Sequence, residues 1–116
     1  MDNKKLGQAG ERLAVNFLEA RGYTIIGQNF RTRFGEIDII ARDGKALVFI
    51  EVKTRSNMKY GTPAEAITKD KLRRIQRLIG DFVSKYQIRS QVRFEVVAIV
   101  KGQVPQLIKE IEFVDK

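Results

Sequence analysis

The chain contains no cysteine and no histidine among its 116 residues, and only two prolines. Without cysteine there is neither a disulfide framework nor a thiolate metal site. Without histidine there are no imidazole ligands and no Ser-His or Cys-His arrangement, and the usual general base at neutral pH is missing. Any hydrolytic chemistry would therefore rest on carboxylates, on lysine and on a bound metal.

Long apolar segments are also missing. No run approaches the ~20 apolar residues that a helix needs to cross a bilayer, and no apolar segment of signal-peptide length follows residues 1–5. We therefore expect a cytoplasmic protein with no membrane partner. A length of 116 residues, 43% of them hydrophobic, predicts one folded domain over residues 1–116.

Basic residues outnumber acidic ones, and the net charge is +8. A surplus of this size favours a polyanionic partner, either nucleic acid or an anionic membrane surface. The alternative is a basic protein whose charge serves no such partner.

The hydrophobic periodicity predicts an α/β sandwich in αβββαββ order, with helices flanking a mixed central sheet. Helices are expected over residues 3–21, with Leu13 on the buried face, and over residues 62–86, with Tyr86 on the buried stripe. The second helix has a capping box at Thr62, and Thr68 is a candidate second cap, so two interpretations stay open for this region, one helix or two. Strands are expected over residues 23–30, 46–52, 92–100 and 106–113, with a further strand paired to residues 46–52 in a hairpin that turns at Asp43-Gly44.

Charged residues end the predicted central strand, where Glu51 and Lys53 follow an apolar run. Charges rarely occupy a central strand unless they are paired or bind metal. With Asp43-Gly44 as the turn, Glu36 opposes Glu51, and directly opposed residues share a face of the sheet. One face would then carry Glu36, Asp38, Glu51 and Lys53, and the other Ile37, Ile39, Val48, Ile50 and Val52.

Acids this close repel each other unless a cation lies among them, and Mg²⁺ commonly takes one or two carboxylates plus water and phosphate. Lys53 could assist the attacking water, or it could be a salt-bridge partner at a strand end. Glu11 lies near Gly7 and Gly10 on the first helix. Each glycine costs a helix about 1 kcal/mol, so something packs or binds close to that backbone. The alternative for Glu11 is a solvated side chain beside close helix–sheet packing.

Several motifs resemble the YraN-type proteins, which are small bacterial proteins predicted to be nucleases. These proteins are similar to archaeal Holliday-junction resolvases, which have the PD-(D/E)XK, restriction-endonuclease-like fold. The motifs are Gly10-Glu11, Asn29-Phe30-Arg31, Gly35-Glu36-Ile37-Asp38-Ile39-Ile40 and Phe49-Ile50-Glu51-Val52-Lys53-Thr54-Arg55. The resemblance covers essentially the whole chain, with a departure at Glu95, where an aspartate would be expected.

The resemblance implies a metal-dependent endonuclease that cleaves structured or branched DNA with Mg²⁺ or Mn²⁺. Asp38 and Glu51 would be metal ligands, with the Val52 carbonyl as a further ligand, and Lys53 would be the catalytic lysine. Glu11 would add an acid from the helix, and Glu36 would lie just outside the ligands. Resolvase-like relatives work as dimers, so the resemblance also implies a homodimer.

Basic residues around the predicted site favour a nucleic-acid-binding surface built on phosphate contacts. Its predicted members are Arg31, Arg33, Arg55, Lys59, Tyr60, Lys71 and Arg74. For any single arginine, a solvated position is the alternative. Two alternative functions also follow from the sequence. One is a non-catalytic nucleic-acid-binding module on a nuclease fold, and the other is a protein–protein adaptor whose charge is incidental.

Overall fold

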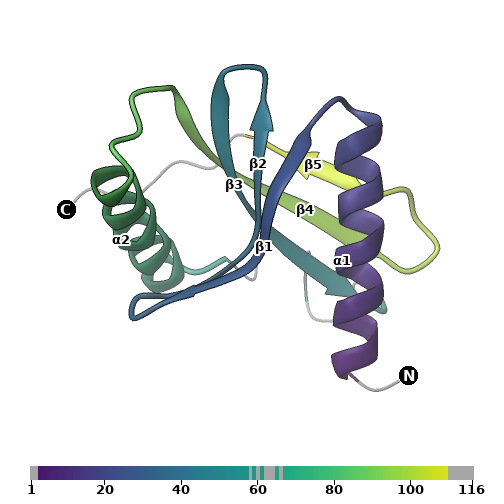
Figure 1. The fold of residues 1–116 in the computed structure, drawn as a ribbon. Helices are drawn as coiled ribbons and strands as arrows, with labels where there is room; N and C mark the ends of the chain where they lie inside the picture. The colour runs from purple at the N-terminus through teal and green to yellow at the C-terminus, as the bar shows by residue number, and fades with distance from the viewer. Residues whose placement is uncertain (1–2, 58, 60, 62–64, 66, 110–116) are drawn as a thin grey trace.

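The computed structural model of the chain describes residues 3–57, 59, 61, 65 and 67–109. Two helices flank a five-stranded sheet, one on each face (Figure 1). The elements are α1(Asn3–Ala20), β1(Thr24–Thr32), β2(Gly35–Asp43), β3(Ala46–Arg55), α2(Lys69–Lys85), β4(Val92–Val100) and β5(Gln106–Ile108). The predicted α/β sandwich and its αβββαββ order are confirmed. Among the described residues, no helix has the length and apolar character that crossing a bilayer requires.

The sheet has the order β1-β2-β3-β4-β5, so β3 is its central strand. β3 pairs antiparallel with β2 and parallel with β4, which makes the sheet mixed. The first six residues of β3 are buried, as expected for a strand that is covered on both faces. Glu51, the sixth residue of this strand, is therefore buried within the sheet.

The β2–β3 turn lies one residue later than predicted. Asp43 pairs with Ala46, so the two central residues of the turn are Gly44 and Lys45. Gly44 has a φ of 60°, which glycine adopts without steric penalty and which suits the first central position of a hairpin turn. The pairing register differs from the predicted one by two residues. Because side chains alternate with a period of two, a shift of two residues does not by itself exchange the faces of the strands.

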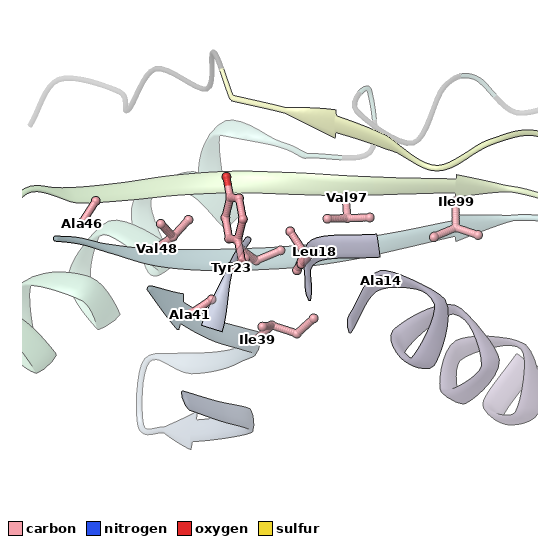
Figure 2. Packing of buried hydrophobic residues seen from close by; sticks show 10 residues of the cluster. Ala14, Leu18, Tyr23, Ile39, Ala41, Ala46, Val48, Val97 and Ile99 are labelled. Carbon is pink, nitrogen blue, oxygen red and sulfur yellow. The ribbon is translucent and has the colours of Figure 1, made fainter. Parts of the chain in front are cut away.

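Helix α1 covers one face of the sheet, where Ala14 and Leu18 pack against Ile39, Val48 and Ile50 (Figure 2). Helix α2 covers the other face. Its buried side chains Ile75, Leu78 and Ile79 pack there with Phe49, Phe94 and Val96. The sheet therefore separates two hydrophobic cores.

Close packing between α1 and β3 depends on Gly10. A Cβ atom at this position would lie 2.0 Å from Thr54 Cγ2, whereas a Cβ atom at Gly7 would meet nothing within 4 Å. The predicted close packing on the α1 backbone is therefore confirmed at Gly10, and among the described residues no such contact is found at Gly7.

Other expectations about the helices are corrected. Helix α2 begins at Lys69 with Thr68 as its N-cap, because Thr68 Oγ1 accepts a hydrogen bond from the Lys71 N–H at 3.1 Å. The predicted cap at Thr62 lies outside the described residues. Leu13 and Tyr86, predicted to be buried, are 50% and 51% exposed. Strand β5 ends at Ile108, so Lys109 is not part of it, and residues 110–113 lie outside the described residues.

Glu95 is a fully buried carboxylate on β4. The Tyr23 hydroxyl donates to Glu95 Oε1 at 2.6 Å, and Arg93 Nε donates to Oε2 at 2.9 Å. Arg93 Nη2 also donates to Asp43 Oδ2 at 2.6 Å. Burial, followed by the hydrogen bond to Glu95, raises the pKa of Tyr23 to about 12, so this hydroxyl remains a donor. Both oxygens of the Glu95 carboxylate therefore have donors, and the network connects β2 and β4 with Tyr23, the residue that precedes β1.

We expect Arg93→Met to lower the free energy of unfolding by about 3–5 kcal/mol, because it leaves the Glu95 carboxylate buried without its countercharge. Urea denaturation at pH 7 measures this change. The matched control is Arg89→Met at an exposed position, which should change stability by less than about 0.5 kcal/mol. Equal effects of the two substitutions would show that Glu95 does not depend on Arg93.

Candidate active site

A pocket of about 410 Å³ lies between α2 and the sheet. Residues from β2, β3 and α2 line it, and they include many of the predicted site residues. These are Glu36, Asp38, Glu51, Val52, Lys53, Lys71 and Arg74. Phe34, Ile75 and Leu78 add apolar side chains to its wall, and sequence reasoning did not identify them as part of the site. The structure therefore brings the predicted acids and lysine of the sheet to one pocket with space for a ligand.

Strands β2 and β3 separate beside this pocket. The last pair in their ladder is Ile39 with Ile50. Beyond this pair, the Val52 N–H donates to the Asp38 side chain, with Oδ2 at 2.7 Å. The N–H and C=O groups of a strand residue point toward the same neighbouring strand. The Val52 carbonyl therefore also points into the gap beside Asp38.

An unusual backbone conformation in β1 accompanies this separation. Asn29 lies opposite Asp38, between the pairs Gln28–Ile39 and Phe30–Ile37. Its φ of 53° is left-handed, a conformation that asparagine tolerates better than most residues. Ile39 packs in the core under α1, whereas Ile37 packs in the core under α2. The prediction that Ile37 shares a face with Ile39 is wrong, because the two side chains pack in different cores.

Asp38 and Glu51 are close enough to share a proton. Burial, the hydrogen bond with Glu51 and the Glu51 charge raise the pKa of Asp38 to about 8. The Glu51 residue is only 5% exposed, and its buried Oε2 atom lacks a hydrogen-bond partner. Lys71 Nζ contacts this oxygen as an ion pair. The Lys71 ammonium therefore supplies the countercharge that this buried oxygen needs.

Glu11 approaches the same acids from α1. It is half-buried, and its charge also contributes to the raised pKa of Asp38. Within the described part of the chain, however, no three acidic, histidine or cysteine side chains are grouped closely enough to hold a metal ion. Asp38 and Glu51 form the pair at the pocket, and the role of Glu11 as a third acid stays a prediction.

Two lysines flank the acid pair. Lys53 Nζ lies 3.9 Å from Glu51 Oε2, the oxygen that Lys71 also contacts. Partial burial, followed by the interaction with Lys71, lowers the pKa of Lys53. Burial opposes the charge of Lys71 as well, but its contacts with Glu51 and Lys53 outweigh this and raise its pKa. Lys53 is thus biased toward the neutral amine while Lys71 stays cationic, a separation of pKa values that suits acid–base chemistry.

The remaining predicted basic residues do not line this pocket. Arg31 Nε is 3.7 Å from Glu36 Oε2, and the Arg33 guanidinium lies 4.8 Å from the centre of the Phe34 ring. Arg55 Nε is buried without a hydrogen-bond partner near the end of β3. Lys59 is exposed in the following loop. Tyr60 lies outside the described residues, so its predicted role stays a prediction.

We expect Asp38→Asn to stabilise the metal-free protein by on the order of 1–3 kcal/mol at pH 8. The folded-state pKa of Asp38 lies above its ordinary value of 3.8. As the pH rises, the Asp38 carboxyl therefore loses its proton at a lower pH in the unfolded state than in the folded state. The free energy of unfolding of the wild type therefore falls as the pH rises from about 4 to about 8, and asparagine removes this fall. Urea denaturation across this pH range, with the exposed Glu19→Gln as control, measures the difference. If the free energies of unfolding of Asp38→Asn and the wild type differed by the same amount at every pH, the account would be contradicted.

A second prediction concerns the backbone at Asn29. Asn29→Val should lower the free energy of unfolding by about 1–2 kcal/mol, because a β-branched residue is strained at positive φ. Asn29→Gly should be close to neutral, since glycine adopts this conformation freely. Urea denaturation of both variants tests this, and equal losses would exclude the left-handed conformation as the cause.

The candidate site lies in the part of the chain that matches a known protein family. The model of the uncharacterised protein family UPF0102 matches residues 10–99, a span that contains Glu11, Asp38, Glu51 and Lys53. A UPF0102 protein of Geobacter metallireducens is 48% identical over 109 residues, covering 92% of this chain and 89% of the relative. One from Rhodococcus opacus is 50% identical over 105 residues, covering 90% and 89%. One from Dictyoglomus turgidum is 42% identical over 108 residues, covering 90% and 92%.

Proposed function

The chain belongs to the uncharacterised protein family UPF0102, and we propose that it is a metal-dependent endonuclease of the PD-(D/E)XK type. Its substrate in this proposal is nucleic acid, with structured or branched DNA as the first candidate. The observation that carries the proposal is the pairing of Asp38 and Glu51 beside two lysines at one open pocket. The YraN-type resemblance of the same residues supports it.

The donor groups at the pocket fit a hard divalent cation. Two carboxylates are close enough to share a proton, and one of them has a buried oxygen with no hydrogen bond. The Val52 carbonyl points into the same gap. Mg²⁺ and Mn²⁺ prefer such oxygen ligands, and Mg²⁺ commonly uses one or two carboxylates with water and substrate phosphate. Asp38, Glu51 and Val52 would therefore hold the ion, and a third acid is not required.

A bound divalent ion supplies Lewis-acid stabilisation of negative charge on a phosphate. The side chains of the chain supply the remaining parts of a hydrolysis. Lys53 Nζ, with its lowered pKa, accepts a proton from the attacking water. Lys71, whose pKa is raised, supplies positive charge beside Glu51 through their contact. Arg74 on the pocket wall can bind a phosphate through two N–H groups.

The charge of the chain supports a nucleic-acid substrate. A net charge of +8 favours association with phosphates, largely independent of sequence. The proposal also includes action in the cytoplasm, in line with the absence of a candidate membrane span among the described residues. A homodimer stays an expectation from the resemblance.

Cleavage assays test this proposal on branched, flapped and linear DNA with Mg²⁺ or Mn²⁺. We expect Asp38→Asn and Lys53→Met each to reduce the cleavage rate by about 100-fold or more, as for the loss of a positioned acid–base group. Lys101→Met, an exposed lysine in the β4–β5 turn, is the matched control and should retain the wild-type rate. A chelator should abolish cleavage.

Two results would contradict the proposal. One is cleavage by both Asp38→Asn and Lys53→Met at the wild-type rate, which would identify a contaminating nuclease. The other is an absence of cleavage by the wild type on all these substrates and on RNA.

A second candidate function is a nucleic-acid-binding module without catalysis. The contact of Lys71 with Glu51 favours it, because the lysine already provides the acid with a countercharge. This alternative predicts salt-dependent binding that is unaffected by Asp38→Asn, and no metal-dependent cutting.

A further inference from the structure

A second pocket of about 410 Å³ lies beside the tip of the β1–β2 hairpin. The hairpin supplies Phe30 and residues 31–33, and the end of α2 supplies Asp81, Phe82, Lys85 and Tyr86. The function proposed above makes no use of this pocket. Figure 1 shows the tip of the hairpin reaching out from the sheet on the side where α2 lies.

The two pockets follow one another along the same stripe of α2. Positions 71, 74 and 78 line the first pocket, and positions 81 and 85 line the second. Residues spaced by three or four share one face of a helix. The hairpin shows the same continuity, with residues 34–36 at the first pocket and residues 30–33 at the second. Both pockets therefore belong to one groove between α2 and the β1–β2 hairpin.

Tyr86 gives this second pocket an aromatic surface. The centres of the Phe30 and Phe82 rings are 5.4 Å apart, and those of Phe82 and Tyr86 are 4.6 Å apart. The Tyr86 N–H donates to the Phe82 carbonyl at 3.0 Å, which fixes the end of the helix. Phe30 and Phe82 are partly buried in the core under α2, whereas Tyr86 is 51% exposed. A half-exposed ring supported from behind by other rings is a suitable platform for stacking a base.

The charges around Tyr86 match a phosphate backbone. Arg33 and Lys85 lie in the wall of the pocket, together with Arg31. Lys85 Nζ is 5.4 Å from the centre of the Tyr86 ring, which places a cation beside the stacking surface. Asp81 adds an acceptor for the amino group of a base. Basic side chains interleaved with an exposed aromatic ring are typical of sites that bind single-stranded nucleic acid.

We propose that this second pocket binds an unpaired nucleotide of the strand that lies in the first pocket, with its base stacked on Tyr86. From Lys71 to Tyr86 the helix rises by about 22 Å, and from Arg74 by about 18 Å. At about 3.4 Å per stacked nucleotide, the unpaired base lies about five to seven nucleotides from the phosphate at the first pocket. This inference rests on the proposed function for its class of ligand, and it specifies a substrate with a single-stranded segment, such as a flap.

The test is a binding measurement that does not require cleavage. The protein is full-length Asp38→Asn, and the probe is a DNA duplex with a ten-nucleotide single-stranded flap. The fluorescent base 2-aminopurine is placed at one flap position at a time. We expect quenching confined to positions about five to seven nucleotides from the junction. The fully paired duplex should bind more weakly.

Variants of the second pocket then identify the partner of the base. Tyr86→Ala should remove the quenching and weaken flap binding by about 5- to 150-fold, the range seen when a base loses its aromatic partner. Tyr86→Phe should retain both, because it keeps the ring. Arg33→Ala changes an exposed side chain outside the cores and should weaken binding. It should also lower the slope of log affinity against log salt concentration by the amount expected for the loss of about one phosphate contact. Urea denaturation confirms that each variant is folded.

The failures of the two proposals are distinguishable. If Tyr86→Ala and Arg33→Ala both bind the flap as Asp38→Asn does, the second pocket is not a nucleotide site, even where the wild type cleaves DNA. Quenching spread evenly along the flap, or equal affinity for the paired duplex, would also overturn the inference. If the wild type cleaves nothing but the Tyr86-dependent quenching is present, the endonuclease proposal fails and the binding site remains.

Discussion

The candidate site depends on the hydrogen bond from the Val52 N–H to Asp38 Oδ2, at 2.7 Å. This bond satisfies a backbone donor at the point where β2 no longer pairs with β3. It allows the central strand to remain hydrogen-bonded while one side of it opens to a pocket. It also fixes the Asp38 carboxyl beside Glu51. The same hydrogen bond therefore accompanies both the separation of the strands and the pairing of the acids.

The two buried glutamates of the sheet show why one of them is a candidate ligand. Glu95 has a hydrogen-bond donor at each oxygen and belongs to a closed network with Tyr23 and Arg93. Glu51 has a buried oxygen that receives countercharge from Lys71 but no directed donor. A buried carboxylate that is fully satisfied stabilises the fold, whereas one with an open lone pair can bind a cation. Glu51 also lines the pocket, so a ligand there can reach its carboxylate.

Much of this arrangement could be predicted from the sequence because it depends on periodicity. The hairpin turn lies one residue from its predicted place, but the resulting register keeps Asp38 and Glu51 on the face that alternation assigns them. Ile37 could not be placed in this way, since strict alternation assigns it to the core of Ile39 whereas it packs in the core under α2. Tyr86 fits the apolar stripe of α2 but lies at the end of the helix, where the core no longer covers it. The contact of Lys71 with Glu51 depends on how α2 is docked on the sheet, which helical spacing alone does not determine.

The central claim is that Asp38 and Glu51 together hold one divalent cation. Titration calorimetry with Mn²⁺ on the full chain tests it most directly, with Glu51→Gln and the distant, exposed Glu19→Gln as a matched pair. The account predicts one ion per chain for the wild type and for Glu19→Gln, and loss of that binding in Glu51→Gln. Binding of Mn²⁺ by Glu51→Gln as tight as that of the wild type, or no binding by the wild type, would contradict it.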